Sequence, residues 1–471
     1  MYMSAPYSGE LCVSAPIFKM AIVLQIPCGK WQSEKFYVAN CVLNTFLGIQ
    51  DAIVQPGTSN EWVMFDSELG EQDRCFRFPN LFFPEREQEI YLTSMHIKKW
   101  ARQATSIAPG ILGIQNYPSQ DIPVLFAAKP CHSLSDIDLF GTIFFYLSRY
   151  EECILGPRDE IGRFLSEQSV VKDFHARPVV DEYIWLIRSL LERAWPGCGL
   201  DGLNYKLLVS HDVDVPHSWL GAHAGTPIRA AARCLLKEAS PRSALRTLRS
   251  YWDASLDPIY CFNWMMNEVE ALGLLASYYF LTGGVHPLDL NYNLASKPIS
   301  SLLSSLATRG HTIGLHGSIN SAYDASLMLK EKEVLEAATG NSVSAVRQHY
   351  LRFSTPDTWR IIASAGLTED STLGYADRAG FRCGTAKRYQ VFDIKAQATL
   401  PVFETPLLCM EQSLLEPTYQ GLTPDQAFDY VVCLVDQVKA FGGNFSLLWH
   451  NHNLVTGIQR DLFLEIIKYA S

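Results

Sequence analysis

The sequence predicts an α/β protein whose larger, C-terminal part is built on a parallel sheet, either open or closed into a barrel. Two observations support this fold class. After residue 205, short apolar runs alternate with helical patterns, and polar residues able to bind a metal follow several of the runs. Alternation of this kind over about 265 residues is typical of parallel strands joined by helices, with the site at the strands' C-terminal ends.

The first part of the chain reads as a smaller α/β domain, because strand-like runs and helical patterns mix in it. Residues 37–47 have the apolar spacing of an amphipathic helix, and residues 137–147 are apolar on all sides, which predicts a buried helix. A helix is also predicted over 180–195. The turn-rich segment 196–202 ends that helix, so we expect an accessory domain over 1–200 and a second domain over 203–471.

The second part supplies the strands and helices of the predicted parallel sheet. Each expected strand is a short apolar run bounded by polar or turn residues, and each expected helix has apolar residues at helical spacing. The expected strands are 207–210, 277–281, 312–315 and 445–449, and helices are expected over 263–272 and 325–338.

Composition excludes several classes of protein. The chain of 471 residues is 48% hydrophobic and 19% charged, as a folded enzyme is, and its net charge of −10 argues against binding to nucleic acid. The basic stretch 229–249 follows a helical pattern and predicts a solvated helix face. The 12 cysteines are scattered, with no C-x-x-C pair, and no apolar run is long enough for a signal peptide or a membrane span. We therefore expect a cytoplasmic protein with reduced cysteines.

Two carboxylates follow the first apolar run, in the segment Ser210-His-Asp-Val-Asp214. Strand residues alternate between faces, so Asp212 and Asp214 are expected to point into the same crevice at the C-terminal end of the strand. Two carboxylates in one pocket repel each other unless a metal, an arginine or a shared proton compensates. The pair is therefore either a chemical site or a local ion-pair arrangement.

Three further motifs follow in chain order: Gly310-His-Thr-Ile-Gly-Leu-His-Gly-Ser318, Arg347-Gln-His-Tyr350 and Leu447-Leu-Trp-His-Asn451. With the aspartate pair, they resemble the motifs of the NodB-homology polysaccharide deacetylases, metal-dependent hydrolases that remove acetyl groups from sugars. The resemblance covers residues 205–471 and implies a distorted (β/α) barrel. Segments 144–152 and 158–164 resemble the extra domain that precedes this module in a bacterial subfamily.

The resemblance implies a role for each motif. A deacetylase has to polarise a carbonyl, activate a water and protonate the leaving amine. Asp214 and His316 are expected to bind a divalent metal, with zinc the expected ion, and Asp212 to act as the base. Arg347 is expected to hold Asp212 ionised and oriented. His450 is the expected proton donor to the departing nitrogen.

One position departs from the family's pattern. The family's second motif carries another histidine four residues after the first, where this chain has Asn320, a much poorer zinc ligand. Three outcomes are open: His349, which stands where the family usually has a proline, supplies the missing nitrogen; Asn320 binds the metal weakly; or the metal is absent. We favour a retained metal with His349 as the replacement ligand.

Other residues are candidates for substrate contact. Tyr350, or a backbone amide near it, is expected to stabilise the oxyanion. Arg382 is expected to bind an anionic substrate group such as a uronate or a phosphate. Trp449 and Tyr375 are expected either to stack on a sugar face or to belong to the core.

Supporting roles fall to residues beside these motifs. Asp370 is the expected partner of Arg347. His452 is expected to support the site next to His450. His311 precedes its strand and is expected to be structural, and His217 is expected to be a loop residue.

The sequence thus favours a metal-dependent deacetylase acting on an acetylated sugar, for example a precursor of a surface glycan such as O-antigen or capsule. Two alternatives stay open. One is hydrolysis of another non-peptide C–N bond on the same fold. The other is a non-catalytic glycan-binding or assembly protein with a degenerate site.

Overall fold

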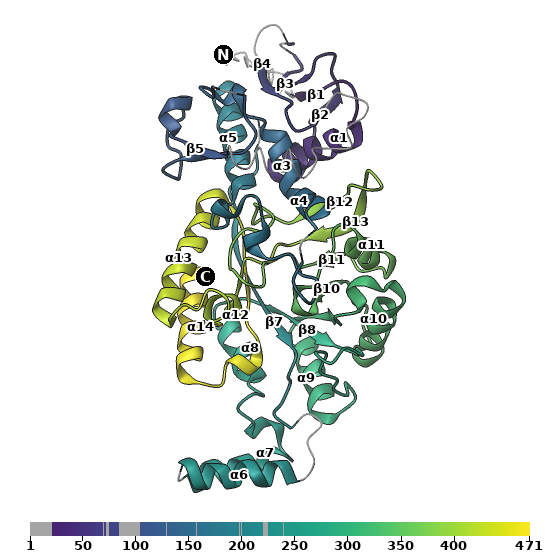
Figure 1. Cartoon of the computed structure of the whole chain (residues 1–471), viewed down its shortest axis with the longest axis vertical. Coiled ribbons are helices and arrows are strands. Elements are labelled where there is room, and N and C mark those ends of the chain that lie inside the picture. Colours follow the sequence, from purple (N-terminus) through teal and green to yellow (C-terminus); the bar gives the residue numbers. More distant parts are fainter. Residues whose placement is uncertain are drawn as a thin grey trace, which may run out of the picture.

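The computed structural model describes residues 21–471 except 69, 72–74, 84–103, 129, 157, 197, 199, 220–224 and 239. A four-stranded sheet lies at one end of the long axis (Figure 1). In it, β1 (Ile22–Ile26) pairs in parallel with β2 (Ile53–Pro56) and antiparallel with β3 (Glu61–Asp66), and β3 pairs with β4 (Cys75–Pro79). The other elements before residue 200 are α1 (Gln32–Asn40), the ribbon of β5 (Thr105–Ile107) and β6 (Ile122–Val124), α3 (Leu139–Leu147), α4 (Tyr150–Ile154) and α5 (Val179–Ala194).

Helix α3 is buried along its whole length, as its uniformly apolar sequence predicts. Asp138 caps its first turn, because the carboxylate accepts hydrogen bonds from the backbone N–H of Gly141 and, across to another segment, of Leu81 and Phe82. The helix expected over 37–47 is only partly as predicted. It begins earlier, at Gln32, and continues from Cys41 to Phe46 with π-helical geometry.

The second part of the chain forms a nine-stranded sheet. All neighbouring strands are parallel except β12 and β13. The order across the sheet is β12 (Tyr389–Asp393), β13 (Ala398–Glu404), β11 (Glu369–Asp370), β10 (Ala345–Gln348), β9 (Thr312–Gly317), β8 (Ala276–Leu281), β7 (Tyr205–Val213), β15 (Gly443–Leu448) and β14 (Cys409–Met410).

This sheet confirms the predicted α/β class and curls without closing. Its outermost strands are β12 and β14, and they do not pair with each other in the described part of the chain. The structure is therefore a curled, half-barrel-like sheet, which is the open form of the two that the sequence left possible, and the full distorted barrel implied by the resemblance is not confirmed.

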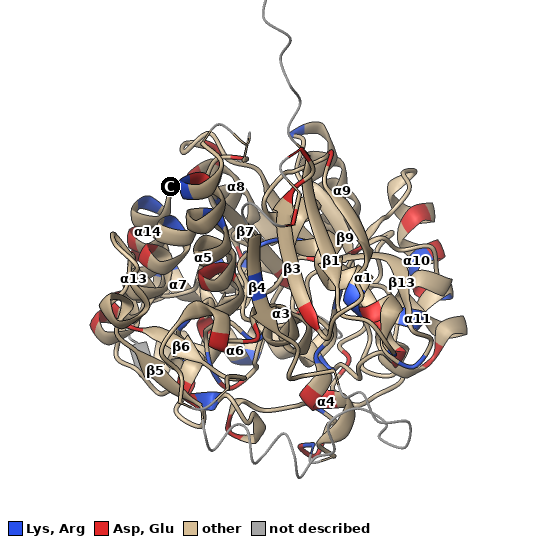
Figure 2. Ribbon diagram, turned by 90° about the horizontal axis from the view of Figure 1, so that it is seen from above, with Lys and Arg blue, Asp and Glu red and all other residues tan. Residues whose placement is uncertain are grey.

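Helices cover the outer side of the curled sheet, with α13 (Pro424–Phe441) and α14 (Gly457–Ala470) on one flank and α10 (Ala325–Thr339) and α11 (Asp357–Ser364) on the other (Figure 2). None of the helices in the described ranges has the combination of length and apolar sequence needed to cross a membrane. The helices of this part are α6 (Gly225–Glu238), α7 (Pro241–Ser250), α8 (Phe262–Glu270), α9 (Lys297–Thr308), α10 (Ala325–Thr339), α11 (Asp357–Ser364), α12 (Glu411–Leu415), α13 (Pro424–Phe441) and α14 (Gly457–Ala470).

The two parts of the chain pack against each other through one continuous apolar core. Phe392 of β12 lies against the rings of Tyr37 and Phe144, at centroid distances of 4.8 and 5.6 Å. Buried Asp181 of α5 accepts hydrogen bonds from Thr385 and the backbone of Ala386. A domain boundary at 196–202 stays a prediction, but contacts across it are extensive.

Candidate active site

The C-terminal ends of β7, β9, β10 and β15 meet at one edge of the curled sheet, as parallel pairing requires. There a pocket of about 210 Å³ is lined by residues that the sequence singled out. These are Asp212 near the end of β7, Asp214 just after it, His316 on β9, His349 and Tyr350 after β10, and His450 and His452 after β15.

Asp214, His316 and His349 form a cluster that fits a divalent metal ion. One ligand atom of each residue lies within 4.8 Å of the others. The Nε2 atoms of His316 and His349 lie 3.2 and 3.7 Å from Oδ1 of Asp214. Ligands at zinc distances of about 2.0–2.2 Å in a tetrahedron are separated by distances of this order.

The hydrogen bonds around the cluster leave the ligand atoms free. Nδ1 of His316 bonds to the carbonyl oxygen of Arg347 at 2.9 Å, and Nδ1 of His349 to Oδ1 of Asp289 at 2.9 Å. Outer contacts of this type fix the ring orientation of metal-binding histidines and leave Nε2 for the ion. Oδ1 of Asp214 is buried and accepts no hydrogen bond in the described part of the chain. The three side chains therefore fit a metal.

Asn320 is not part of this cluster. It lies outside the residues that line the pocket, and its side-chain oxygen is 3.5 Å from a guanidinium nitrogen of Arg352. The alternative in which Asn320 replaces the missing histidine is therefore not supported. The third side chain that the fold places beside Asp214 and His316 is His349.

The charges of the cluster keep Asp214 ionised, the state in which a carboxylate binds a cation. Burial raises the pKa of Asp214, but the charges of His349 and His450 and the nearby ring nitrogen of His316 outweigh burial and bring it well below its usual value. Burial lowers the pKa of His349, and the carboxylates of Asp214 and Asp289 more than compensate, raising it to about 9.

Asp212 is buried and held by Arg347, as expected. A guanidinium nitrogen of Arg347 donates to Oδ1 of Asp212 at 3.0 Å and to Ser210 Oγ at 2.9 Å. Asp370 does not hold Arg347, which corrects the sequence-based prediction. Ser371 does so instead, because its carbonyl and hydroxyl oxygens accept from Arg347 at 2.8 and 2.9 Å.

His450 is paired with a carboxylate that the sequence did not reveal. Oε1 of Glu411, the first residue of α12, lies 2.6 Å from Nδ1 of His450 and accepts from the backbone N–H of His450 at 3.0 Å. Burial lowers the pKa of His450, but Glu411, Asp214 and Asp212 outweigh it and raise the value to about 10. His450 is therefore cationic at neutral pH.

Tyr350 lies at the mouth of the pocket in an uncommon backbone conformation. Its φ is 60°, and the φ of Leu351 is 55°, so two successive residues with side chains adopt the left-handed region. Such residues cost free energy and cluster at functional sites. Tyr350 is the most exposed of the predicted site residues, at 38%, which suits a contact with substrate.

Two predicted substrate-binding residues lie elsewhere. Arg382 is buried and forms a bidentate ion pair with Glu152 at 2.7 and 2.9 Å, so it is a structural link to the first part of the chain. Trp449 is fully buried, and its ring packs on Phe463 at 5.4 Å. The expectation for Arg382 is corrected. For Trp449 and for Tyr375, which is also buried, the structure supports the alternative that they belong to the core.

The remaining histidines behave as expected. Nδ1 of His311 accepts from the backbone N–H of Ala276, and its Nε2 lies 3.0 Å from Glu270, so His311 is structural. His217 is not among the pocket residues. His452 lines the pocket with its ring 5.3 Å from that of His450.

Sequence reasoning missed several residues that line or support the pocket. Asp289 and Glu411 orient the histidines. Arg163 and Tyr419 form part of the pocket wall, and a guanidinium nitrogen of Arg163 lies 3.3 Å from the Tyr419 hydroxyl. Arg163 falls in the segment 158–164 of the first part of the chain, so both parts build the site.

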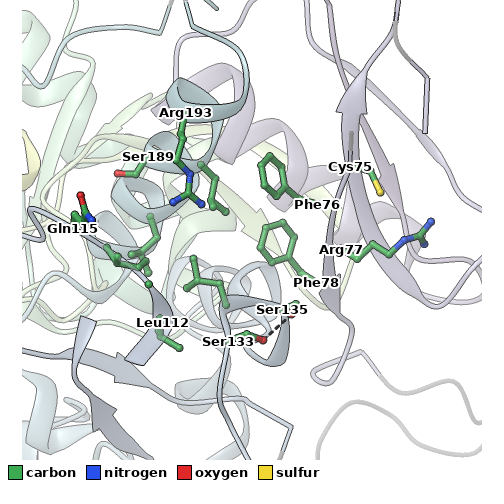
Figure 3. A pocket seen from close by; sticks show the side chains of 15 residues that line it. Cys75, Phe76, Arg77, Phe78, Leu112, Gln115, Ser133, Ser135, Ser189 and Arg193 are labelled. Atoms are coloured by element: carbon green, nitrogen blue, oxygen red, sulfur yellow. Dashed lines mark hydrogen bonds between the residues drawn. The ribbon is translucent and has the colours of Figure 1, made fainter. Parts of the chain in front are cut away.

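A larger cavity, of about 710 Å³, lies in the first part of the chain (Figure 3). Phe76 and Phe78 of β4 and Leu186 and Leu190 of α5 are among the residues that line it. Its lining contains no aspartate, glutamate or histidine. The larger cavity is therefore not the candidate active site. The residues able to carry out hydrolysis line the smaller pocket at the edge of the curled sheet.

Comparisons with known proteins give partial matches. Residues 24–196 match the model of a family of unknown function (DUF7033). No curated protein matches the chain. Among solved structures, it is similar to a putative polysaccharide deacetylase from Mycobacterium smegmatis, with 16% identity, a TM-score of 0.37, and coverage of 58% of this chain and 85% of the other.

A second similar structure is a mutant of a CE4 family pseudoenzyme with restored enzymatic activity. The identity is 9%, the TM-score 0.28, and the coverage 57% of this chain and 64% of the other. With TM-scores this low, the function of this chain has to be inferred from its own residues.

Proposed function

We propose that this protein is a metal-dependent hydrolase that removes an acetyl group from an acetylated sugar, such as a precursor of a surface glycan. The observation that carries the proposal is the convergence of three groups on one pocket. They are the cluster of Asp214, His316 and His349, the Asp212–Arg347 pair and the Glu411–His450 pair. Together they supply the parts that amide or ester hydrolysis needs.

A divalent metal held by Asp214, His316 and His349 would act as a Lewis acid toward the acetyl carbonyl and lower the pKa of water. Zinc suits this donor set, since two imidazoles and one carboxylate recur in catalytic zinc sites that keep a position open. Asp289 and the Arg347 carbonyl hold the two rings in place. This arrangement limits the reorganisation that the site needs during reaction.

Asp212 is the candidate general base. Arg347 holds Oδ1, while Oδ2 lies 3.8 Å from Nε2 of His316 and so faces the metal cluster. Asp212 would take a proton from the attacking water there. The guanidinium of Arg347 also stacks on the ring of Tyr279 at 4.5 Å, which fixes its position.

His450 is the candidate general acid. Its Nε2 lies 3.5 Å from Oδ2 of Asp214, on the pocket side of the ring, while Glu411 holds the opposite nitrogen. A cationic imidazole in this position can donate a proton to the leaving nitrogen or oxygen of the sugar. The acid and the base thus reach the pocket from β15 and β7.

The pocket wall supports an acetyl group as the part of the substrate that enters. Leu288, Leu290 and Met410 line the pocket beside the polar cluster and offer apolar contact to a methyl group. Arg163 and Tyr419 form a polar side that would contact sugar hydroxyls.

The test combines metal analysis with acetate release. Purified protein is assayed for bound zinc and for acetate liberated from acetylated sugars, alongside Asp212→Asn and Arg382→Lys as a variant outside the pocket. We expect stoichiometric metal and acetate release that Asp212→Asn lowers by at least about 10²-fold. Metal-containing protein that hydrolyses only non-sugar amides would favour another C–N hydrolase. Metal-free protein that binds glycan and never releases acetate would refute the proposal.

A further inference from the structure

Helices α6 and α7 form a hairpin that extends away from the body of the molecule. Figure 1 shows it at the end of the long axis opposite the four-stranded sheet. The hairpin lies in the connection between β7 and α8, which leaves the sheet at the edge that carries the candidate active site. The sequence predicted only a solvated basic helix face here.

The outer face of α6 is apolar and exposed to solvent. Ile228, Leu235 and Leu236 occupy positions i, i+7 and i+8, which lie on one side of a helix. They are 62%, 49% and 86% exposed. Trp252, just after α7, is 78% exposed. Single exposed apolar residues need no explanation, but a row of them on a projecting helix marks an interaction surface.

Another part of the α6 surface, beside the apolar row, is used for packing on α7. Ala231 of α6 and Ala244 of α7 are buried, and the Sγ of Cys234 lies 3.7 Å from the Thr247 hydroxyl. The indole N–H of Trp219 donates to Ser250 at the end of α7 and ties the hairpin to the chain that precedes it. The apolar row therefore stays exposed beside the contact between the two helices.

Basic residues flank the apolar row in an otherwise acidic protein. Residues 225–252 contain six Lys or Arg residues and one Glu, whereas the whole chain has a net charge of −10. Arg229 and Arg233 follow the apolar row on α6, and Arg242 and Arg249 lie on one face of α7. None of these four guanidinium groups forms an ion pair within the described part of the chain.

We infer that the α6–α7 hairpin is a docking surface for an anionic lipid bilayer. A helix with an exposed apolar row, flanking arginines and a nearby tryptophan has the composition of one that lies in the membrane interface. Anionic headgroups would pair with the arginines, while Ile228, Leu235 and Leu236 enter the acyl boundary. A second copy of the chain fits less well, because two such hairpins face to face would bring their arginines together.

Docking through this surface would bring the candidate active site near the membrane. Gly225 stands eleven residues after Asp214 in the sequence, and a fully extended segment of that length spans at most about 40 Å. The docking surface itself does not depend on the proposed hydrolase activity, so it is tested separately.

The experiment is co-flotation of the full-length protein with vesicles. We expect binding to phosphatidylcholine vesicles that contain phosphatidylglycerol and little binding to pure phosphatidylcholine. Leu235→Glu or Leu236→Glu should weaken binding by about tenfold or more, since each leucine loses its apolar burial. Arg229→Glu with Arg233→Glu should weaken it by at least about fivefold per position. Higher salt should also weaken binding, because it screens the arginines.

The matched controls are Ile458→Glu and Lys468→Glu, which change exposed residues of α14 and should leave flotation unchanged. Circular dichroism and the thermal midpoint identify any variant that fails to fold. Three results would each overturn the inference. They are no flotation of the wild type with anionic vesicles, equal loss in the α14 controls, or a dimer in solution that Leu236→Glu converts to a monomer.

Discussion

His349 occupies the place from which a third metal ligand has to come, and its ring is fixed from behind by Asp289. We predict that His349→Ala lowers zinc affinity by about 10³-fold, because it removes a metal ligand. Loss of a residue that only holds a ligand in place typically lowers affinity by about 10–100-fold. Asp289→Asn, which affects the residue behind His349, should lower zinc affinity by about 10–100-fold. Competition with a chelating dye measures both values.

Asn320 provides the control for that measurement. Asn320→Ala removes the residue at the family's usual ligand position, and this side chain lies outside the pocket. Zinc affinity should stay within about twofold of the wild type. This change is much smaller than the one expected when a residue that holds a metal ligand in place is lost. A large loss in Asn320→Ala with none in His349→Ala would reverse the assignment of the third ligand.

Glu411 is predicted to set the pH range in which His450 can donate a proton. The carboxylate raises the pKa of His450, so Glu411→Gln should lower it. A general acid is active only while protonated, and the basic limb of the pH–rate profile should therefore move to lower pH. A profile measured from pH 6 to 10 on the same acetylated substrate tests the direction. An unchanged basic limb would exclude His450 as the titrating acid.

The residues that could be predicted from the sequence are those at strand ends. Asp212, Asp214, His316 and His450 each follow an apolar run, and parallel pairing brings such ends together. Asp289 follows no apolar run. Glu411 does follow one, 407–410, but only two residues of that run form a strand, so it was not among the expected strands. Arg382 was assigned wrongly, since a polar loop sequence does not show that its charge is neutralised by Glu152, which is 230 residues away.

At the scale of elements, long apolar runs were predicted well and short ones were not. β8, β9 and β15 lie within two residues of the expected strands at each end, whereas β7 continues to Val213, three residues beyond the expected 207–210. β11 and β14 have two residues each, too few for period-two alternation to be recognised. The antiparallel pair of β12 and β13 also escaped prediction, because only tertiary packing places it at the end of a parallel sheet.

The buried ion cluster between α4 and the loop after β11 should control stability in acid. Burial raises the pKa of Glu152, but Arg382 and Arg149 outweigh it and lower the value from 4.5 to about 2. A carboxylate whose pKa is lower in the folded than in the unfolded protein stabilises the fold at pH values above its unfolded pKa. This stabilisation is lost as the pH falls toward the folded pKa.

Glu152→Gln should therefore destabilise the protein at pH 6 by about 3 kcal/mol, the equivalent of the shift in pKa. The difference from the wild type should shrink as the pH falls from about 4.5 toward about 2, where Glu152 is protonated in both states. Urea unfolding at several pH values measures it. A difference that stays constant over this range would mean that the charge of Glu152 is not what stabilises the cluster.

At the scale of the whole molecule, metal binding should be visible as stability. Free zinc at about 1,000 times its Kd adds about 4 kcal/mol to a folded state that alone binds it. We predict that chelation lowers the Tm of the wild type and that zinc restores it. Asp214→Asn should show neither change. Calorimetry with and without zinc tests this without any substrate.

The contact between Tyr37 and β12 has a consequence for how the chain can be divided. β12 is an outermost strand of the large sheet. The hydroxyl of Tyr37 donates to the carbonyl oxygen of Gln390 in β12 at 2.7 Å. The rings of Tyr37 and Phe144 cover Phe392 of the same strand. Outermost strands with free backbone groups and apolar side chains recruit strands from other molecules.

A fragment of residues 203–471 would lose this cover. We predict that it self-associates in size-exclusion chromatography, and that co-expression with residues 1–200 suppresses the association. A fragment that stays monomeric would show that β12 needs no protection. By covering β12, the first part of the chain would thus prevent the outermost strand of the sheet from pairing with other molecules.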